Sequence, residues 1–187
     1  MNQQTTMEPI DFEAMDRRFI KNLLSCVHAN EDGIHTLKNV WGKRAMNYCA
    51  LFIMLGGIDF QVVKEKETYF FIESLLFSIE TKRNSKPDGT YISIPELIGR
   101  YYGHSPSENS RKKIIALMGM KYDKHNIFEQ KLKSLILSNG VKELKAGENV
   151  DYVALLRDLK FWNKKTRDVQ LRWSNKIAKA ARLLEED

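Results

Sequence analysis

The sequence predicts an all-α fold, arranged as a compact bundle of about nine helices. Interruptions are scarce, because the 187 residues include only four prolines and ten glycines, the residues that most often break regular structure. Apolar residues recur at the three- and four-residue spacing of a helix, and strand-like alternation is hard to find. With 43% hydrophobic residues, a chain of this length buries a core without disulfide or metal support. We therefore expect one helical domain over 1–187, with a polar tail at 1–9, which could divide into packed sub-bundles at 10–103 and 104–187.

Four helices are expected in the first part of the chain. The first three are amphipathic, and the third ends at Gly56 and Gly57, where glycine can adopt left-handed backbone. The apolar residues that set their spacing are Phe12, Met15, Phe19 and Leu23, then Ile34, Leu37 and Trp41, then Ala45, Tyr48, Cys49 and Phe52. The fourth helix, from Glu65 to about Glu80, carries so many apolar residues that it should be central and buried on most sides.

A polar loop is expected next, over 81–93, with a brief extended stretch from Tyr91 to Ile94. Pro95 suits the first turn of a short helix that ends at Gly103, because proline lacks a donor that would be unpaired there anyway. Helices near 108–120 and 125–138 follow, and the segment from Gly140 to Gly147 separates them from the C-terminal part of the chain.

Two regular helices follow this separating segment. Their apolar faces consist of Tyr152, Leu155, Leu156, Leu159 and Trp162 in the first and of Val169, Trp173, Ile177, Ala180 and Leu184 in the second. Both tryptophans lie on these faces, so we expect them to pack in the core rather than to stack on nucleic-acid bases.

Positive charge is concentrated in the second half of the chain. The net charge is +6, yet residues 157–182 alone carry nine basic and two acidic residues, and residues 100–133 carry eight basic and three acidic residues. Spacing on the last helix places Arg172, Lys176, Lys179 and Arg182 in a row that faces solvent. Such a row is often only a solvated surface. The local excess of positive charge in these segments nevertheless favours a polyanionic partner, which supplies the counter-charge.

No catalytic or metal-binding pattern is found. Cys26 and His28 are two residues apart, so on a helix they point in different directions, and neither a nucleotide-binding loop nor a nucleophile with its base is present. A metal-dependent nuclease could be imagined from four aspartates, which we interpret instead as helix caps and ion-pair partners. These aspartates are Asp123, Asp151, Asp158 and Asp168. We expect no enzyme activity, no metal and no cofactor.

The compartment is expected to be the reducing cytoplasm. Only two cysteines are present, which gives no disulfide framework. The sequence contains no apolar run long enough to span a membrane, and the first 16 residues carry acidic but no basic side chains, which speaks against a signal peptide.

The C-terminal region carries a specific motif. It consists of Val150-Asp151-Tyr152, Leu155-Leu156-Arg157-Asp158-Leu159, Phe161-Trp162 and Val169-Gln170-Leu171-Arg172-Trp173. This pattern resembles the tail of the CasB family, the small subunit of the type I-E CRISPR surveillance complex called Cascade. The resemblance continues more loosely through Arg111-Lys112-Lys113 and Lys121-Tyr122-Asp123-Lys124 to Leu132-Lys133. Near the N-terminus, Leu37-Lys38-Asn39 stands where the family often has Leu-Arg-Arg.

The resemblance implies a non-catalytic, all-α subunit without chemistry of its own. Its expected partners are the backbone and large subunits of Cascade, a second copy of itself, the target DNA and, indirectly, the guide RNA. It would hold DNA phosphates, mainly of the displaced non-target strand, while the R-loop forms. The cations expected to do so are Lys38, Arg111, Lys112, Lys113, Lys121, Lys124, Lys133, Lys164, Lys165 and Arg167.

Two further points stay open from the sequence. Arg157 and Arg172 could contact DNA, or they could pair with Asp158, Asp168 or a neighbouring subunit. A helical protein–protein adaptor, whose lysines serve only solubility, is the alternative to DNA binding.

Overall fold

The computed structural model describes residues 11–29, 57, 66–83, 89–122 and 127–182. Within these ranges the chain is mostly helical, which confirms the all-α prediction. The elements in chain order are α1 (Phe12–Ala29), α4 (Lys66–Glu80), β1 (Thr90–Ile92), α5 (Ile94–His104), α6 (Glu108–Gly119), α7 (Ile127–Ser138), the 3-10 helix η2 (Gly140–Glu143), β2 (Glu148–Val150), α8 (Tyr152–Lys160) and α9 (Asp168–Arg182). The two helices expected around Trp41 and Cys49 lie outside the described residues.

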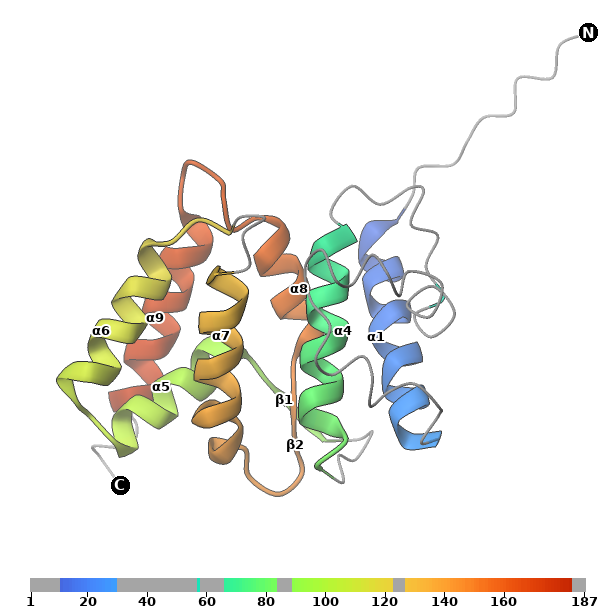
Figure 1. Ribbon diagram of the computed structural model, residues 1–187, viewed down its shortest axis with the longest axis horizontal. Coiled ribbons are helices and arrows are strands. Elements are labelled where there is room, and N and C mark those ends of the chain that lie inside the picture. Colours follow the sequence, from blue (N-terminus) through green and yellow to red (C-terminus); the bar gives the residue numbers. More distant parts are fainter. Residues whose placement is uncertain (1–10, 30–56, 58–65, 84–88, 123–126, 183–187) are drawn as a thin grey trace, which may run out of the picture.

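Helix α4 is the centre of the molecule, as its sequence predicts. Every residue from Thr68 to Glu80 is buried, because α1, α7 and α8 all pack against it. Figure 1 shows α4 between α1 on one side and α7 on the other, with α8 beside it. Burying a side chain the size of Phe or Leu contributes about 1.5–3 kcal/mol, so this helix is a principal source of stability.

A short parallel strand pair replaces part of the expected loop. Thr90 pairs with Glu148 and Ile92 with Val150, and the backbone N–H of Asp151 donates to Ile92 O at 2.9 Å. The Asp151 carboxylate then accepts from Ala154 N at 2.9 Å, which confirms its prediction as the cap of α8. The strand pair therefore fixes where α8 begins.

Helices α5 and α9 form the most extensive helix pair among the described elements. They approach so closely at Gly99 that an added Cβ would lie 2.5 Å from Ile177 O and 2.8 Å from the Ala180 Cβ. Pro95 lies in the first turn of α5, as predicted. The pair joins residues from both sides of the 103/104 boundary suggested by the sequence.

An aromatic cluster connects α7 and α9 with the turn that follows α8. Trp162 is fully buried and packs edge-on against Phe128 and Trp173, with ring centroids 4.8 Å and 5.0 Å away. Its indole N–H donates to Met120 O at 3.0 Å. The indole N–H of Trp173 donates to Asp158 Oδ2 at 2.6 Å. The prediction that both tryptophans belong to the core is confirmed.

Candidate nucleic-acid interface

The structure describes eight of the cations proposed to hold phosphate, while Lys38 and Lys124 lie outside the described residues. Seven of the eight are exposed and one is buried. The exposed ones are Arg111, Lys112, Lys113, Lys121, Lys164, Lys165 and Arg167. They come from two places in the fold, the helix α6 with the residues that follow it, and the turn between α8 and α9.

Four hydrogen bonds hold the α8–α9 turn against the C-terminal end of α6. Trp162 donates to Met120 O, as described above, and the Arg167 guanidinium donates to Met118 O. The Tyr122 backbone N–H donates to Asn163 Oδ1 at 2.8 Å, and the Asn163 amide donates back to Tyr122 O. Segments 40 residues or more apart in sequence are thereby joined.

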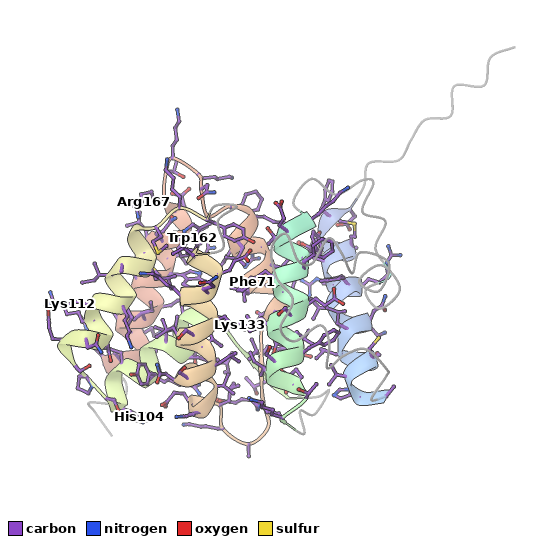
Figure 2. The ribbon with its side chains drawn as sticks, in the orientation of Figure 1. Phe71, His104, Lys112, Lys133, Trp162 and Arg167 are labelled. Atoms are coloured by element: carbon purple, nitrogen blue, oxygen red, sulfur yellow. The ribbon has the colours of Figure 1, made fainter. Side chains whose placement is uncertain are left out.

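This junction brings together the two separate basic segments of the sequence. Lys121 belongs to the α6 side, and Lys164, Lys165 and Arg167 belong to the turn, so we call these four residues the basic end. Figure 2 shows Arg167 on the turn at the top of the molecule, above the buried Trp162. Within the described ranges, no residue of the basic end forms a salt bridge with a carboxylate.

The backbone at Arg167 is strained. Its φ angle is 55°, a left-handed conformation that costs a non-glycine residue about 1–2 kcal/mol. Arg167 N donates to Lys164 O at 3.1 Å and Arg167 O accepts from Leu171 N at 3.0 Å, so the conformation closes the turn and starts α9. Strained residues held in this way often mark functional positions.

An exposed aromatic residue, which the sequence analysis did not single out, borders the basic end. Phe161 is 44% exposed, and the Lys164 ammonium lies 4.3 Å from the centre of its ring. A cation held over an aromatic face is attracted to the electrons of the ring. In the sequence Phe161 is part of the C-terminal motif but does not belong to the apolar face that ends at Trp162, so the apolar spacing gave no sign of its position at the surface.

A second group of cations lies near the N-terminal end of α6. Arg111 and Lys112 approach the Glu108 carboxylate at 3.5 Å and 3.8 Å, but these pairs are largely exposed and contribute little. Lys112 is seven residues before Gly119, which corresponds to about 10 Å along the helix axis. Figure 2 shows Lys112 at the outer edge of α6, away from Arg167. The structure therefore supports a basic end beyond the C-terminal end of α6 and a flanking group near the N-terminal end of that helix.

The prediction that Lys133 is available to bind phosphate is wrong. Its side chain lies inside the fold, only 5% exposed, and its ammonium donates to Ser74 Oγ of α4 at 2.9 Å. Figure 2 shows it between α7 and α4. Burial lowers the pKa of Lys133 from 10.5 to about 8, with the Glu129 carboxylate opposing this shift. A phosphate cannot reach this group while the helices are packed, so Lys133 is removed from the candidate interface.

Two other cations of the basic segments are also bound internally. Lys160 donates to both Asp16 carboxylate oxygens, at 2.7 Å and 2.8 Å, and Arg100 binds Glu148 at 2.7 Å. The net charge of these segments along the chain therefore overstates the charge that they present to solvent.

The solvent-facing row predicted on α9 is confirmed, because its four cations are exposed. They are Arg172, Lys176, Lys179 and Arg182. Arg172 also donates to the buried Asp158 carboxylate, whereas Arg157 lies 4.0 Å from the same group. For Arg172 the structure thus favours the ion-pair alternative.

The aspartates that could suggest a nuclease have structural partners. Asp151 caps α8, Asp158 accepts from Arg172 and Trp173, and Asp168 accepts from the Thr166 hydroxyl at 2.6 Å. Asp123 lies outside the described residues. Among the described side chains, no group of three or more His, Cys, Asp or Glu residues is placed to bind a metal ion.

The helices of the described ranges are too short or too polar for membrane spans.

Comparison with known proteins identifies the fold. No protein-family model and no curated protein matches the chain. The chain is similar to the crystal structure of a CRISPR-associated protein of the Cse2 family from Thermus thermophilus, with 19% sequence identity, a TM-score of 0.57, and coverage of 87% of this chain and 96% of that chain. It is also similar to the crystal structure of CasB from M. ruber, with 16% identity, a TM-score of 0.58, and coverage of 95% and 98%. The chain therefore has the fold of these proteins over nearly their full length, as the C-terminal motif predicts.

Proposed function

We propose that the chain is a CasB-type small subunit of a type I-E CRISPR surveillance complex, without catalytic activity of its own. In this proposal it lies beside the backbone and large subunits and a second copy of itself. It contacts the phosphates of target DNA, mainly those of the displaced non-target strand, and so stabilises the R-loop. The shared fold and the C-terminal motif support membership of the complex.

The observation that carries the DNA-binding proposal is the basic end. Four cations from two distant segments lie around one junction, in exposed positions and without described salt bridges. Contacts with phosphates release condensed counterions, which makes such a surface bind any sequence and bind more weakly as salt rises. Strand exchange in an R-loop replaces one duplex by another of similar stability. A few phosphate contacts are then enough to shift the equilibrium toward the open loop.

The test uses the chain assembled with its guide RNA and partner subunits. A triple variant, Lys121→Glu, Lys164→Glu and Lys165→Glu, changes the basic end. A second triple variant, Lys82→Glu, Lys131→Glu and Lys142→Glu, changes the same total charge at lysines elsewhere on the surface of the fold. The fraction of R-loop is followed by permanganate reactivity of thymines in the displaced strand, at salt concentrations between 50 and 200 mM, and assembly is checked by gel filtration.

We expect the basic-end variant to assemble and to form less R-loop than the control. Its plot of log affinity against log salt should be less steep by about 2, because each lost contact with a single strand removes about 0.7 from the slope. Equal R-loop formation and equal slopes in the two variants would refute the proposed role of the basic end.

A protein–protein adaptor without a direct nucleic-acid role is the alternative. It is favoured by a different observation, a groove between α1 and α8 that is lined by exposed aromatic side chains. If the chain acts only as an adaptor, charge reversal at the basic end leaves R-loop formation unchanged.

A further inference from the structure

A long groove runs between α1 and α8, with a volume of about 860 Å³. One wall is a single face of α1, which includes Asp16, Ile20 and Leu24, and the other wall includes Val153 of α8. Ile20 and Leu24 are one helical turn apart, so the apolar wall is continuous. The lining residues of α1 extend from Phe12 to His28, which corresponds to about 24 Å of helix.

Exposed aromatic residues are concentrated on this groove. In the part of the chain that the structure describes, the large apolar side chains at the surface are Phe12, Tyr91, Ile115, Ile127, Phe161 and Leu171. The three aromatic members of this set, Phe12 at 51% exposed, Tyr91 at 53% and Phe161 at 44%, all line the groove. Aromatic side chains are enriched at protein–protein interfaces, where they supply much of the binding energy.

The continuous apolar wall of Ile20 and Leu24 favours a protein occupant over a nucleic-acid strand, whose backbone is charged along its length. Three acidic side chains also line the groove. Each one already has a partner within the fold. Asp16 is bound by Lys160 at 2.7 Å, Glu13 by Arg17 at 2.6 Å, and Asp151 caps the start of α8.

The charged side chains of the groove that have no close ion-pair partner among the described residues are positive. Lys21 is exposed and forms no salt bridge with a described carboxylate. The Arg157 side chain is 59% exposed, and its nearest carboxylate, Asp158, lies 4.0 Å away and is already bound by Arg172 and Trp173. Lys21 and Arg157 come from the two opposite walls. A complementary occupant therefore brings an apolar stripe with acidic side chains beside it.

We infer that this groove docks an acidic amphipathic helix of a protein partner, with the apolar face of that helix between Phe12 and Phe161 and its carboxylates facing Lys21 and Arg157. A helix of about four turns matches the length of the groove. The inference rests on the proposed function only in taking the partner to be another protein of the same complex. It assigns protein docking to the α1–α8 groove and leaves phosphate contacts to the basic end.

The test measures binding of a designed probe to the full-length chain, without the rest of the complex. The probe is a fluorescent 16-residue helical peptide with a Leu stripe flanked by Glu, and its counterpart carries Lys in place of Glu. Fluorescence anisotropy is recorded for the wild type and for two groove variants, Lys21→Glu with Arg157→Glu, and Phe12→Ser with Phe161→Ser. Matched controls are Lys82→Glu with Lys142→Glu, and Ile115→Ser with Leu171→Ser, at surface positions outside the groove. Circular dichroism confirms that each variant is folded, and oligothymidylate binding is measured in parallel.

We expect the wild type to bind the acidic peptide at least tenfold more tightly than the basic one. Each groove variant should weaken binding of the acidic peptide at least tenfold, and each control should weaken it less than twofold. Equal binding of both peptides, or groove variants that match their controls, would overturn the inference. A groove variant that loses oligothymidylate instead of the peptide would assign the groove to nucleic acid. Failure of the basic-end variant in the R-loop experiment leaves these peptide results unaffected, so the two proposals fail separately.

Discussion

Replacing the buried Lys133 by methionine should remove a distinct pH dependence of stability. The Lys133 ammonium lies in the core beside Ser74 Oγ, and burial lowers its pKa from 10.5 to about 8. A shift of this size corresponds to about 3 kcal/mol, at about 1.4 kcal/mol per pKa unit. The charged form is therefore less favourable in the folded protein than in the unfolded chain.

The sign of the effect follows from proton binding. As pH rises from about 8 to 10.5, folded Lys133 releases its proton before unfolded Lys133 does. The unfolded state then binds more protons, so the free energy of unfolding increases with pH. Below about pH 8 the full penalty for the buried charge is present. The Lys133→Met variant has no group that titrates at this position, so the difference in unfolding free energy between the wild type and this variant should shift in favour of the wild type as pH rises.

Urea unfolding followed by circular dichroism from pH 7 to pH 10 measures this effect. The stability of the wild type relative to Lys133→Met should rise by about 2–3 kcal/mol across the range. Burial also raises the pKa values of Tyr122 and Tyr152, but these groups are present in both proteins, so their effect cancels in the difference. Lys131→Met, at an exposed lysine of the same helix, should leave the pH slope unchanged. Parallel curves for the wild type and Lys133→Met would show that Lys133 is not desolvated in solution.

Four further substitutions test the packing and the turn. Gly99→Ala places a Cβ 2.5 Å from Ile177 O and should lower the free energy of unfolding by about 1–3 kcal/mol in urea titrations. Gly119→Ala meets no atom within 4 Å and should raise it by about 0.5–1 kcal/mol, so equal effects at the two glycines would contradict the close α5–α9 contact. Asp158→Asn weakens the hydrogen bonds from Arg172 and Trp173. It should lower the free energy of unfolding by about 1–3 kcal/mol, as measured by tryptophan fluorescence during urea unfolding. An unchanged urea midpoint would exclude a structural role for this carboxylate. Arg167→Gly relieves the left-handed backbone, so its free energy of unfolding should stay within about 1 kcal/mol of the wild type. The variant also lacks one cation, so the slope of log affinity for single-stranded DNA against log salt should become less steep by about 0.7. An unchanged slope in gel-shift titrations would remove Arg167 from the interface.

Much of the fold could be predicted because the information is local. The apolar spacing on α1, α8 and α9 and the cap at Asp151 depend on neighbours within one or two turns. The excess of apolar residues on α4 also predicts its central position. The parallel pairing of Thr90–Ile92 with Glu148–Val150 depends on residues far apart in sequence, and strands of three residues carry too little pattern to identify a partner. The sequence therefore suggested only a brief extended stretch.

The candidate site was less predictable, because charge along a sequence does not give charge at a surface. Lys133 lies at the edge of the apolar face of α7 formed by Phe128, Leu132, Leu135 and Ile136, and a helical wheel leaves such an edge position open to either environment. It is buried because α7 packs against α4, the central helix. The basic end differs from Lys133, because the fold brings its cations together at the surface. Lys121 and Lys164 belong to separate segments of the sequence, and only the hydrogen bonds at the junction, such as those of Asn163 with Tyr122, bring them together.

Trp162 lies between residues of the two proposed surfaces in sequence and anchors the segment that carries both. On one side of it in sequence, Phe161 lines the α1–α8 groove, and on the other side Asn163 and Lys164 belong to the turn at the basic end. The Trp162 ring is fully buried, its N–H binds Met120 O, and its carbonyl accepts from the Gln170 amide at 2.6 Å. A residue held at three points gives the neighbouring side chains a fixed direction. A partner protein in the groove and a phosphate chain at the basic end would thus contact adjoining side chains of one rigid segment, because the Lys164 ammonium lies 4.3 Å from the centre of the Phe161 ring.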